Sequence, residues 1–146
     1  MAVRSGGPGK AVGRTMMRMI VWLYRRTGGR VGGSMRGAPV LLITSTGRRS
    51  GRPWTTPVIY QADGDGWVVI ASNAGSTRHP AWWLNLRASP EATIEIGRDT
   101  YPVTAHKVDD DERARLWQKM VAVYPGYDGY TKKTSRQIPV VRLDRR

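Results

Sequence analysis

The sequence predicts a mainly β protein of the α+β class, a small closed or split β-barrel of six strands with a few short helices. Its length of 146 residues suits a single folded domain. Six short runs rich in aliphatic and β-branched residues follow one another between turn signals. Most are separated by tight turns, so neighbouring strands would pair as hairpins, and short antiparallel strands in series are typical of small barrels.

Glycine, proline and aspartate mark the ends of these strands. Asp63-Gly64-Asp65-Gly66 is a strong hairpin signal, and Arg98-Asp99 joins a later pair of strands. The predicted strands cover residues 40–46, 55–61, 67–72, 92–97, 101–108 and 138–143.

Helices are expected before and between the strands. The clearest begins after Asp109, which can cap it, and Glu112 completes a capping-box-like pattern. Its apolar residues recur on one face until Pro125 stops it. The other predicted helices cover residues 15–26, 80–88 and 127–134.

Positive charge is concentrated ahead of the barrel. The formal net charge is +13, and residues 1–36 contain eight basic residues and no acidic residue. Residues 1–13 are glycine-rich and predicted to be disordered, and the glycines of residues 27–37 predict a flexible linker. We therefore divide the chain into a basic N-terminal arm with an amphipathic helix, residues 1–36, and a barrel domain, residues 37–146.

Two interpretations of the helix in the arm stay open. Arg14, Arg18 and Arg25 fall within about 40° of one another on a helical wheel. The apolar residues on the opposite side are Met16, Met19, Ile20 and Leu23. Such a helix can lie on an anionic membrane surface, or its apolar face can pack on the barrel. Because neither a membrane span nor a secretory signal is evident, we expect a cytoplasmic protein. On the first interpretation it would be peripheral on the inner face of the cell membrane.

Several common kinds of catalytic site have no support in the sequence. There is no cysteine, and the two histidines, His79 and His106, stand 27 positions apart without a metal-binding motif. No phosphate loop of the Walker or Gly-x-Gly-x-x-Gly type occurs. We therefore predict no bound metal, and we expect an enzyme of this composition to take its reactivity from an organic cofactor.

The turn at residues 47–52 is the first candidate binding segment. It places Arg48, Arg49, Ser50 and Arg52 directly after a strand. Guanidinium and backbone N–H groups converging there could hold a phosphate or a carboxylate. A solvated basic hairpin would have the same sequence, so this pattern alone leaves both interpretations open.

Two aromatic segments are further candidates. Trp82 and Trp83 are adjacent on a short helix, so one could line a cleft while the other packs in the core, and Asn85 shares the face of the first. Tyrosines recur at intervals of three around a glycine-containing turn, at Tyr124, Tyr127 and Tyr130. They could line a pocket for an aromatic ligand or only pack on the barrel.

Taken in order, these segments resemble the deazaflavin (F420)-dependent nitroreductase family. The similar stretches are residues 41–51, 56–58, 72–75, 79–86 and 138–141, together with the tyrosine series. The resemblance implies a split β-barrel and coenzyme F420, a deazaflavin with a phosphate and an oligoglutamate tail, as cofactor. It also implies an oxidoreductase that transfers a hydride from the reduced coenzyme to an electron-poor acceptor, such as a quinone, an enone or a nitroaromatic compound.

The resemblance further assigns roles by position. Arg48, Arg49 and Ser50 would hold the phosphate and acidic tail. The residues bordering the deazaflavin ring would be Pro57, Val58, Ala71, Ser72 and Asn73, and those completing the groove Trp82, Trp83 and Asn85. Tyr124, Tyr127 and Tyr130 would line the substrate side, and Tyr127 or Tyr130 would assist proton transfer. The sequence departs from the family pattern at Asn73, Ala74 and Trp83, where lysine, glycine and tyrosine are frequent.

Two other functions compete with this one. A basic barrel with exposed aromatic residues could bind single-stranded nucleic acid. The residues after position 36 carry a net charge of only +5, however, and the aromatic residues cluster late in the chain. The same barrel could hold FMN in place of the deazaflavin. We expect a small-molecule acceptor and no nucleic acid as partner, while the sequence leaves the oligomeric state open.

Overall fold

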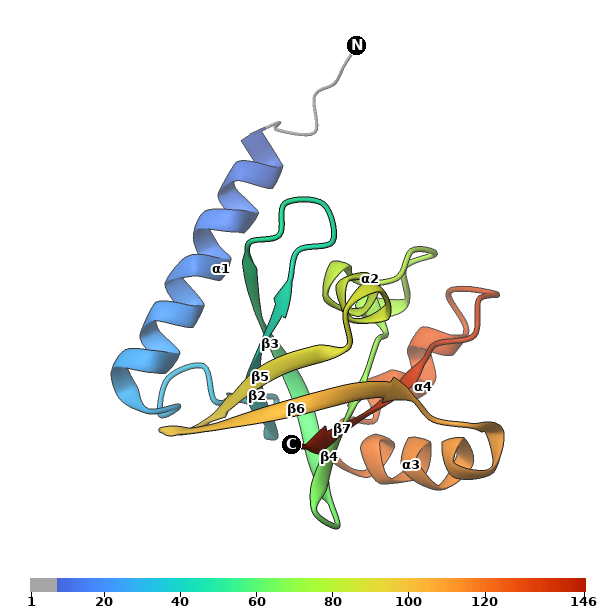
Figure 1. Cartoon of the computed structure of the whole chain (residues 1–146). Helices are drawn as coiled ribbons and strands as arrows, with labels where there is room; N and C mark the ends of the chain where they lie inside the picture. The colour runs from blue at the N-terminus through green and yellow to red at the C-terminus, as the bar shows by residue number, and fades with distance from the viewer. Residues whose placement is uncertain (1–7) are drawn as a thin grey trace.

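A computed structural model describes residues 8–146 of the chain (Figure 1). Six antiparallel strands follow the order β2-β3-β4-β7-β6-β5, and β5 closes the barrel by pairing with β2. The strands are β2 (Ala38–Thr46), β3 (Pro53–Asp63), β4 (Gly66–Ile70), β5 (Glu91–Ile96), β6 (Asp99–Lys107) and β7 (Val140–Arg145). The predicted mainly β, six-stranded barrel is confirmed. A two-residue strand, β1 (Ser34–Met35), was not predicted and pairs with the start of β2.

The β2–β3 hairpin ends in the arginine-containing turn. Thr46 pairs with Pro53 at the last position of the ladder. Gly51 has a φ of +73°, a backbone conformation that favours glycine. Gly47 leaves room for a neighbouring side chain, because a Cβ placed there would lie 2.6 Å from the Ser50 Oγ. The turn is therefore compact and held by its own residues.

Helix α2 (Ala81–Ala88) covers one end of the barrel (Figure 1). Trp82, Trp83 and Leu86 pack there against inward-facing strand residues such as Leu41 and Ile94. Both tryptophans are at most 5% exposed. The helix thus closes the barrel while placing its first residues at the rim.

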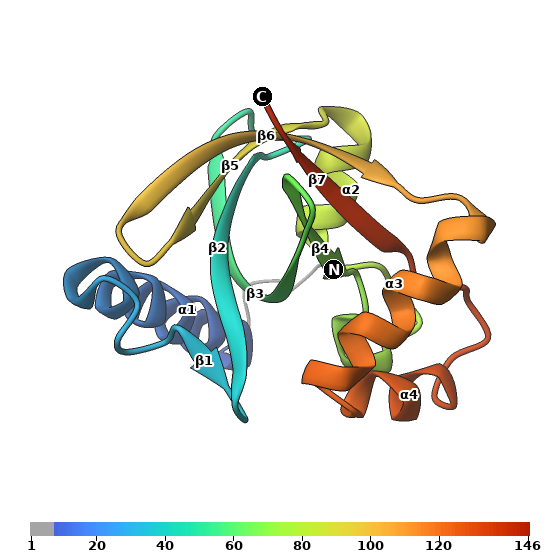
Figure 2. The same cartoon turned by 90° about the horizontal axis from the view of Figure 1, so that it is seen from below.

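The other helices cover the outer surface of the barrel. Helix α1 (Pro8–Thr27) lies on one flank, and α3 (Asp110–Val123) and α4 (Gly126–Thr131) lie on the other (Figure 2). These helices pack on outward-facing strand residues such as Val40, Ile59 and Val68, which form a second core. The predicted cap of α3 is present, since the Asp109 carboxylate accepts a 3.0 Å hydrogen bond from the Glu112 N–H.

Helix α1 begins earlier than the sequence predicts, and the residues through which it packs on the barrel are not those of the predicted apolar face. It starts at Pro8, so the prediction of disorder is wrong for residues 8–13, while residues 1–7 lie outside the described part of the chain. Its buried residues are Val21 and Tyr24, whereas the predicted apolar residues Met16 and Met19 are each 55% exposed. The helical period places a different stripe against the barrel, one that includes the amphipathic tyrosine.

Tyr24 fastens α1 to the seam between β2 and β5. Its hydroxyl lies 3.0 Å from the Val40 carbonyl oxygen, to which it donates, and accepts a 3.1 Å hydrogen bond from the Gly97 N–H. Arg25, the next residue, forms a 2.8 Å ion pair with Glu95 of β5. The glycine-rich segment that follows contains β1 and folds back through the 3.0 Å hydrogen bond from the Val40 N–H to the Gly33 carbonyl. Within residues 8–146, no helix is both long and apolar enough to cross a membrane.

Candidate active site

An open groove of about 480 Å³ runs along the outer face of the barrel between α1 and α4. Pro57, Ile59 and Ile70 of β3 and β4 are among the residues that line it, with Met17 of α1 on one side. The volume lies within the range of about 300–1,000 Å³ that is usual for pockets for small molecules and cofactors. The groove therefore has the size and the apolar strand surface expected of a site for a flat aromatic ligand.

Most of the residues that the family resemblance placed near the ring and the substrate meet in this groove. The predicted residues that line it are Pro57, Val58, Ser72, Asn73, Trp82, Tyr124, Tyr127 and Tyr130. They come from β3, the loop after β4, α2 and the region of α4, which are far apart in sequence. Ala71 and Trp83 instead lie in the interior core, at 0% and 5% exposure.

The arginine turn lies at the hairpin tip and outside the lining of the groove. Arg48, Arg49 and Ser50 are all exposed. The Ser50 hydroxyl accepts a 3.1 Å hydrogen bond from the Arg52 N–H, so it closes its own turn. The guanidinium groups of Arg49 and Arg52 form no ion pair with any described residue, and they present uncompensated positive charge.

Asn85 braces this turn from below. It is only 2% exposed. Its Oδ1 accepts hydrogen bonds from the Arg48 N–H at 3.0 Å and from the Arg48 guanidinium at 3.3 Å, and its Nδ2 donates to the Ser45 Oγ at 3.2 Å. The structure therefore places Asn85 behind the arginine turn, linking α2 to the end of β2, and not on the groove surface.

The three tyrosines form one aromatic cluster with two kinds of environment. Tyr127 is 3% exposed and packs edge-on against Tyr124, with ring centroids 4.9 Å apart. Burial raises the pKa of Tyr127 well above its usual range. Tyr130 is half-buried, and its hydroxyl lies 2.8 Å from that of Tyr124. The hydrogen bond to Tyr124, and then burial, raise the pKa of Tyr130, so this hydroxyl stays protonated at neutral pH.

The loop after β4 is held in an unusual backbone conformation. Asn73, Ala74 and Gly75 have consecutive φ values of +47°, +54° and +79°. For a residue with a Cβ, this left-handed conformation costs on the order of 1 kcal/mol or more. Gly75 also packs tightly on the α4 region, because a Cβ there would lie 3.1 Å from the Tyr130 carbonyl oxygen. The strained loop and the tyrosine cluster are therefore positioned together.

Arg136 holds both ends of this loop. Its guanidinium donates 2.8 Å hydrogen bonds to the carbonyl oxygens of Ser72 and Ser76, and a 3.1 Å bond to the His79 Nδ1. A guanidinium group can only donate, so Nδ1 accepts and His79 is neutral in this arrangement. Burial is the main cause that lowers the pKa of His79, and the positive charge of Arg136 lowers it further.

Several residues around the groove were not predicted from the sequence. Met17, Met35, Trp54, Thr56, Ile59 and Ile70 line it, and Arg136 supports its loop. The alternation of β3 could have indicated Ile59, because it lies on the same face of the strand as the predicted Pro57. Met17 and Arg136 carried no comparable signal, because their positions depend on how α1 and the segment before β7 fold back on the barrel.

Comparison with known proteins shows where this barrel belongs. A solved structure of an F420-H2 dependent reductase, FDR-A, is 33% identical and matches 73% of this chain and 94% of its own, with a TM-score of 0.68. A second solved structure, a domain-swapped dimer, is 27% identical, with a TM-score of 0.70 over 94% of this chain and all of its own. The barrel and its groove thus define a protein of the F420-dependent reductase class.

The sequence relationships are more specific. The family model for F420H(2)-dependent quinone reductases matches residues 16–144. An F420H(2)-dependent quinone reductase of Mycobacterium tuberculosis is 41% identical over 139 residues, which cover 92% of this chain and 93% of the relative. The chain belongs to the F420H(2)-dependent quinone reductase family. The predicted relationship to F420-dependent oxidoreductases is confirmed, and with it the prediction of an enzyme that uses coenzyme F420.

Proposed function

We propose that this enzyme transfers a hydride from reduced coenzyme F420 to a quinone-type acceptor bound in the groove between α1 and α4. The observation that carries the proposal is the convergence of an apolar strand surface and a hydrogen-bonded tyrosine pair in one groove, with a turn of exposed arginines at the tip of the hairpin that includes β3. Membership of the quinone reductase family supports the same chemistry. The groove also fits an enone or a nitroaromatic ring, so these remain candidate acceptors.

The residues present fit the coenzyme in both shape and charge. Pro57 and Val58, with Ser72 and Asn73 at the loop, offer a mixed apolar and polar border for a planar ring, and Trp82 lies alongside them. Arg49, with no ion pair among the described residues, and Arg48 would hold the phosphate and acidic tail. Asn85 contributes by fixing the Arg48 backbone, and Ser50 by closing the turn.

Residues of the chain orient the acceptor and supply the proton that it takes up on reduction. When bound, coenzyme F420 supplies the hydride. The Tyr130 hydroxyl donates a hydrogen bond to the oxygen of the acceptor on which negative charge develops. The Tyr124 hydroxyl, 2.8 Å away, can donate a hydrogen bond to the oxygen of Tyr130 after Tyr130 gives up its proton, and solvent returns that proton to the half-exposed Tyr130. The apolar strand surface and the aromatic side chains beside it hold the rings in reacting geometry.

Tyr130 is the better candidate of the two tyrosines considered for proton transfer. Tyr127 is nearly buried and packs against Trp117 and both neighbouring tyrosines. Its main contribution in this proposal is to support the cluster. Tyr130 combines partial exposure with a hydrogen-bonded hydroxyl, which a proton donor requires.

Anaerobic mixing of the protein with reduced F420 and a water-soluble quinone tests the proposal. The expected result is enzyme-dependent recovery of the oxidised coenzyme's absorbance together with equimolar quinol. Reduced FMN in place of the deazaflavin is the cofactor control and should give no acceleration. Failure to oxidise reduced F420 with any quinone, enone or nitroaromatic compound would contradict the proposal.

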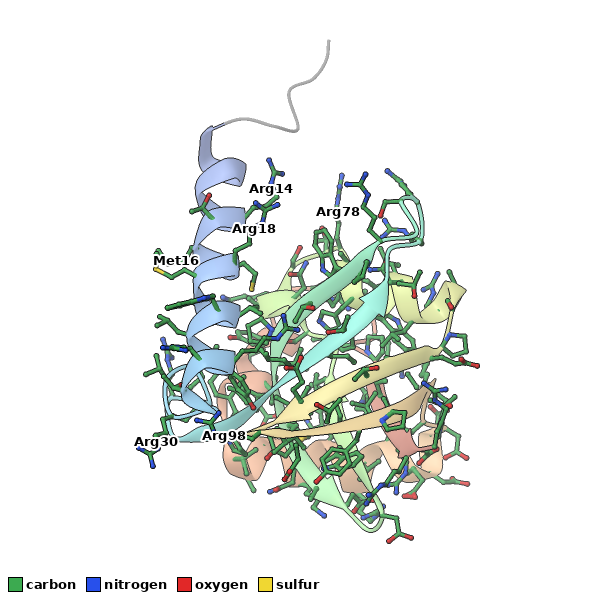
Figure 3. The ribbon with its side chains drawn as sticks, turned by 60° about the vertical axis from the view of Figure 1, so that its left-hand side comes forward. Arg14, Met16, Arg18, Arg30, Arg78 and Arg98 are labelled. Atoms are coloured by element: carbon green, nitrogen blue, oxygen red, sulfur yellow. The ribbon has the colours of Figure 1, made fainter. Side chains whose placement is uncertain are left out.

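The outer surface of α1 favours a second role, attachment to an anionic membrane surface. Met16 and Met19 are each 55% exposed, and Met16 points away from the barrel (Figure 3). Arg26 is exposed and follows Met19 by seven residues, so it lies on the same side of the helix, and an exposed apolar stripe beside an arginine matches the interface of an anionic bilayer. In this view residues 1–36 form a functional arm of the barrel domain, residues 37–146, and place the enzyme peripherally on the inner face of the membrane.

Vesicle flotation tests this role without removing α1, whose Tyr24 is part of the core. The protein should float with vesicles containing anionic lipid, and the double variant Met16→Glu with Met19→Glu should not. Both side chains are exposed, so folding should be retained, which circular dichroism would check. Equal flotation of the two proteins would contradict membrane attachment through this helix.

A further inference from the structure

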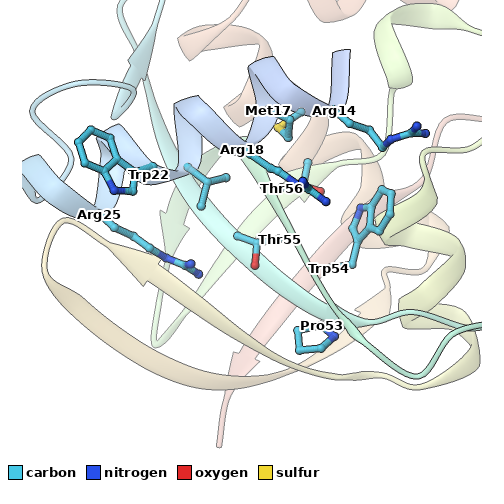
Figure 4. A pocket seen from close by; sticks show the side chains of 10 residues that line it. Arg14, Met17, Arg18, Trp22, Arg25, Pro53, Trp54, Thr55 and Thr56 are labelled. Carbon is cyan, nitrogen blue, oxygen red and sulfur yellow. The ribbon is translucent and has the colours of Figure 1, made fainter. Parts of the chain in front are cut away.

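A second groove of about 510 Å³ lies between α1 and β3 (Figure 4). Its wall on the helix includes Met17, Val21 and Trp22, and its wall on the strand includes Pro53 and Trp54. Its remaining lining residues are Arg14, Arg18, Arg25, Thr55 and Thr56. None of the residues predicted from the sequence to form the site lies in this lining.

The second groove adjoins the candidate active site. Met17, Trp54 and Thr56 line both grooves, so the two grooves meet at these three side chains. A ligand with its ring beside the tyrosine cluster could therefore extend under α1 without leaving the surface of the barrel.

The lining contains large apolar side chains that the chain leaves open to water. Trp22 is 61% exposed, Trp54 45% and Met17 36%. Exposed apolar surface gathered in one concave place is a usual mark of a binding site. Each of these side chains would gain from burial against an apolar ligand.

The arginines of this groove are compatible with an apolar occupant. The Arg25 guanidinium is paired with Glu95 and so is already compensated. Arg14 and Arg18 belong to the side of α1 that faces the barrel (Figure 3), where their methylene stems can cover an apolar chain while their charged ends stay in water. An acidic ligand would meet Arg14 and Arg18 but would leave both tryptophans uncovered.

We infer that the groove between α1 and β3 binds the apolar side chain of a quinone acceptor whose ring lies in the active-site groove. The inference rests on the proposed function, because it extends the acceptor site of the same reaction. It makes the enzyme selective for quinones that carry a long hydrocarbon chain, and it gives α1 a direct part in acceptor binding.

Two quinones with the same ring, one without a side chain and one with a chain of two isoprene units, test the inference. Both are used in lipid-free solution, so the membrane plays no part. The wild-type protein should prefer the chain-bearing quinone, and Trp22→Ala should lower the ratio of the two kcat/KM values about tenfold, as expected for loss of a central aromatic contact. Trp22→Phe should retain most of the preference.

Binding without the coenzyme gives a second readout. Quenching of tryptophan fluorescence by the chain-bearing quinone measures its dissociation constant, which should rise about tenfold in Trp22→Ala. Met19→Ala is the matched control, because Met19 is similarly exposed on the same helix but lines neither groove. It should change neither the ratio nor the dissociation constant.

Other outcomes would overturn the inference, and they differ from failure of the proposed function. Equal preference for the two quinones, or equal effects of Trp22→Ala on both, would show that the chain lies elsewhere. If Arg14→Gln with Arg18→Gln weakened binding of F420 more as its glutamate tail lengthened, the acidic tail would be the occupant and the inference would be wrong. If neither quinone were reduced while the chain-bearing one still quenched fluorescence with the predicted variant effect, the proposed function would fail and the groove assignment would stand.

Discussion

The two ends of strand β3 differ in whether the nearby positive charges are paired with a carboxylate. At its C-terminal end, the Asp63 carboxylate forms ion pairs with Arg115 at 2.9 Å, with Lys119 at 3.0 Å and with Arg142. Asp63 is only 8% exposed. At its N-terminal end, Arg49 and Arg52 form no ion pair with any described residue. The cations that link α3 and β7 to the β3–β4 hairpin are thus paired with a carboxylate. Those of the turn before β3 are not.

This difference separates charges that stabilise the fold from charges that are available to a ligand. A carboxylate bonded to three cations stabilises the folded state, because charge-assisted hydrogen bonds more than offset the hydrogen bonds to water that are lost on burial. Exposed arginines that repel one another contribute nothing comparable to stability, whereas the anionic part of the coenzyme, in the proposed function, would compensate their charge. The predictions below test this distinction.

The largest effect is expected from removing the two arginines of the turn that would hold the acidic part of the coenzyme. Arg48→Ala with Arg49→Ala should raise the dissociation constant for F420 roughly 100-fold, since two charge-assisted interactions are lost. The remaining binding should depend less on salt. Fluorescence titration at low and high salt measures both effects. The double variant Arg26→Ala with Arg30→Ala, on exposed arginines away from the groove, is the control, and equal behaviour of the two double variants would remove the distinction between these cations.

At the other end of β3, Asp63→Asn should change stability and leave coenzyme binding unaltered. The hydrogen bond from Arg115, aided by those from Lys119 and Arg142, holds the pKa of Asp63 well below its usual range. The free energy of unfolding should fall by about 2 kcal/mol at pH 7, as for a hydrogen bond to a charged group. Urea denaturation measures this loss, and Asp65→Asn, at an exposed neighbour without an ion pair, is the control.

The pH dependence of this loss has a definite sign. Because the pKa of Asp63 is lower in the folded than in the unfolded chain, its stabilisation is complete above the ordinary carboxyl pKa of about 4. It is lost as the pH falls from there through the lowered folded value. The wild type and Asp63→Asn should therefore converge in stability at low pH, and a difference that stayed constant down to pH 2 would contradict the assignment.

Two tyrosine hydroxyls show the same contrast between a group that supports the fold and one that is available to a ligand. The expected effect on turnover is smaller. The Tyr24 hydroxyl is hydrogen-bonded to backbone groups of the barrel, whereas the Tyr130 hydroxyl is bonded, within residues 8–146, only to that of Tyr124 beside the groove. Tyr130→Phe should lower kcat about tenfold, a modest value for loss of a proton donor, and change the dissociation constant for F420 little. Tyr127→Phe is the control, because this side chain packs inside the cluster. Equal turnover in the two variants would contradict the assigned roles.

Arg136 is an intermediate case, because it is a cation bonded internally that supports the groove. Arg136→Gln should loosen the loop that contains Asn73 and Ala74, and raise the dissociation constant for F420 about threefold, as for one lost hydrogen bond. Arg136→Lys should restore part of the affinity. If Arg136→Gln lowered only the free energy of unfolding, with normal coenzyme affinity, the residue would serve the fold alone.

The sequence was informative where local patterns determine structure. The hairpin at Asp63–Gly66 and the cap at Asp109 were predicted because turn and capping preferences act over a few residues. The face of α1 that packs on the barrel could not be predicted in the same way. Tyr24 is buried because its hydroxyl reaches backbone groups of β2 and the β5–β6 turn, which are distant in sequence.

The same limit applies to the site. The family pattern predicted residues that do line one groove, such as Pro57, Trp82 and Tyr130. It did not distinguish residues that line the groove from residues that support it from behind. Asn85 lies behind the arginine turn, as its burial and its bonds to Arg48 and Ser45 show. The second groove was not predictable, because it forms only where α1 lies beside β3.

The most direct measurement of the central claim is a fluorescence titration of the purified protein with coenzyme F420, with FMN titrated alongside. We expect saturable binding of the deazaflavin, weakened by salt, and no comparable binding of FMN. Binding of FMN in preference to F420, or of neither, would contradict the assignment of the groove and the arginine turn to the deazaflavin coenzyme.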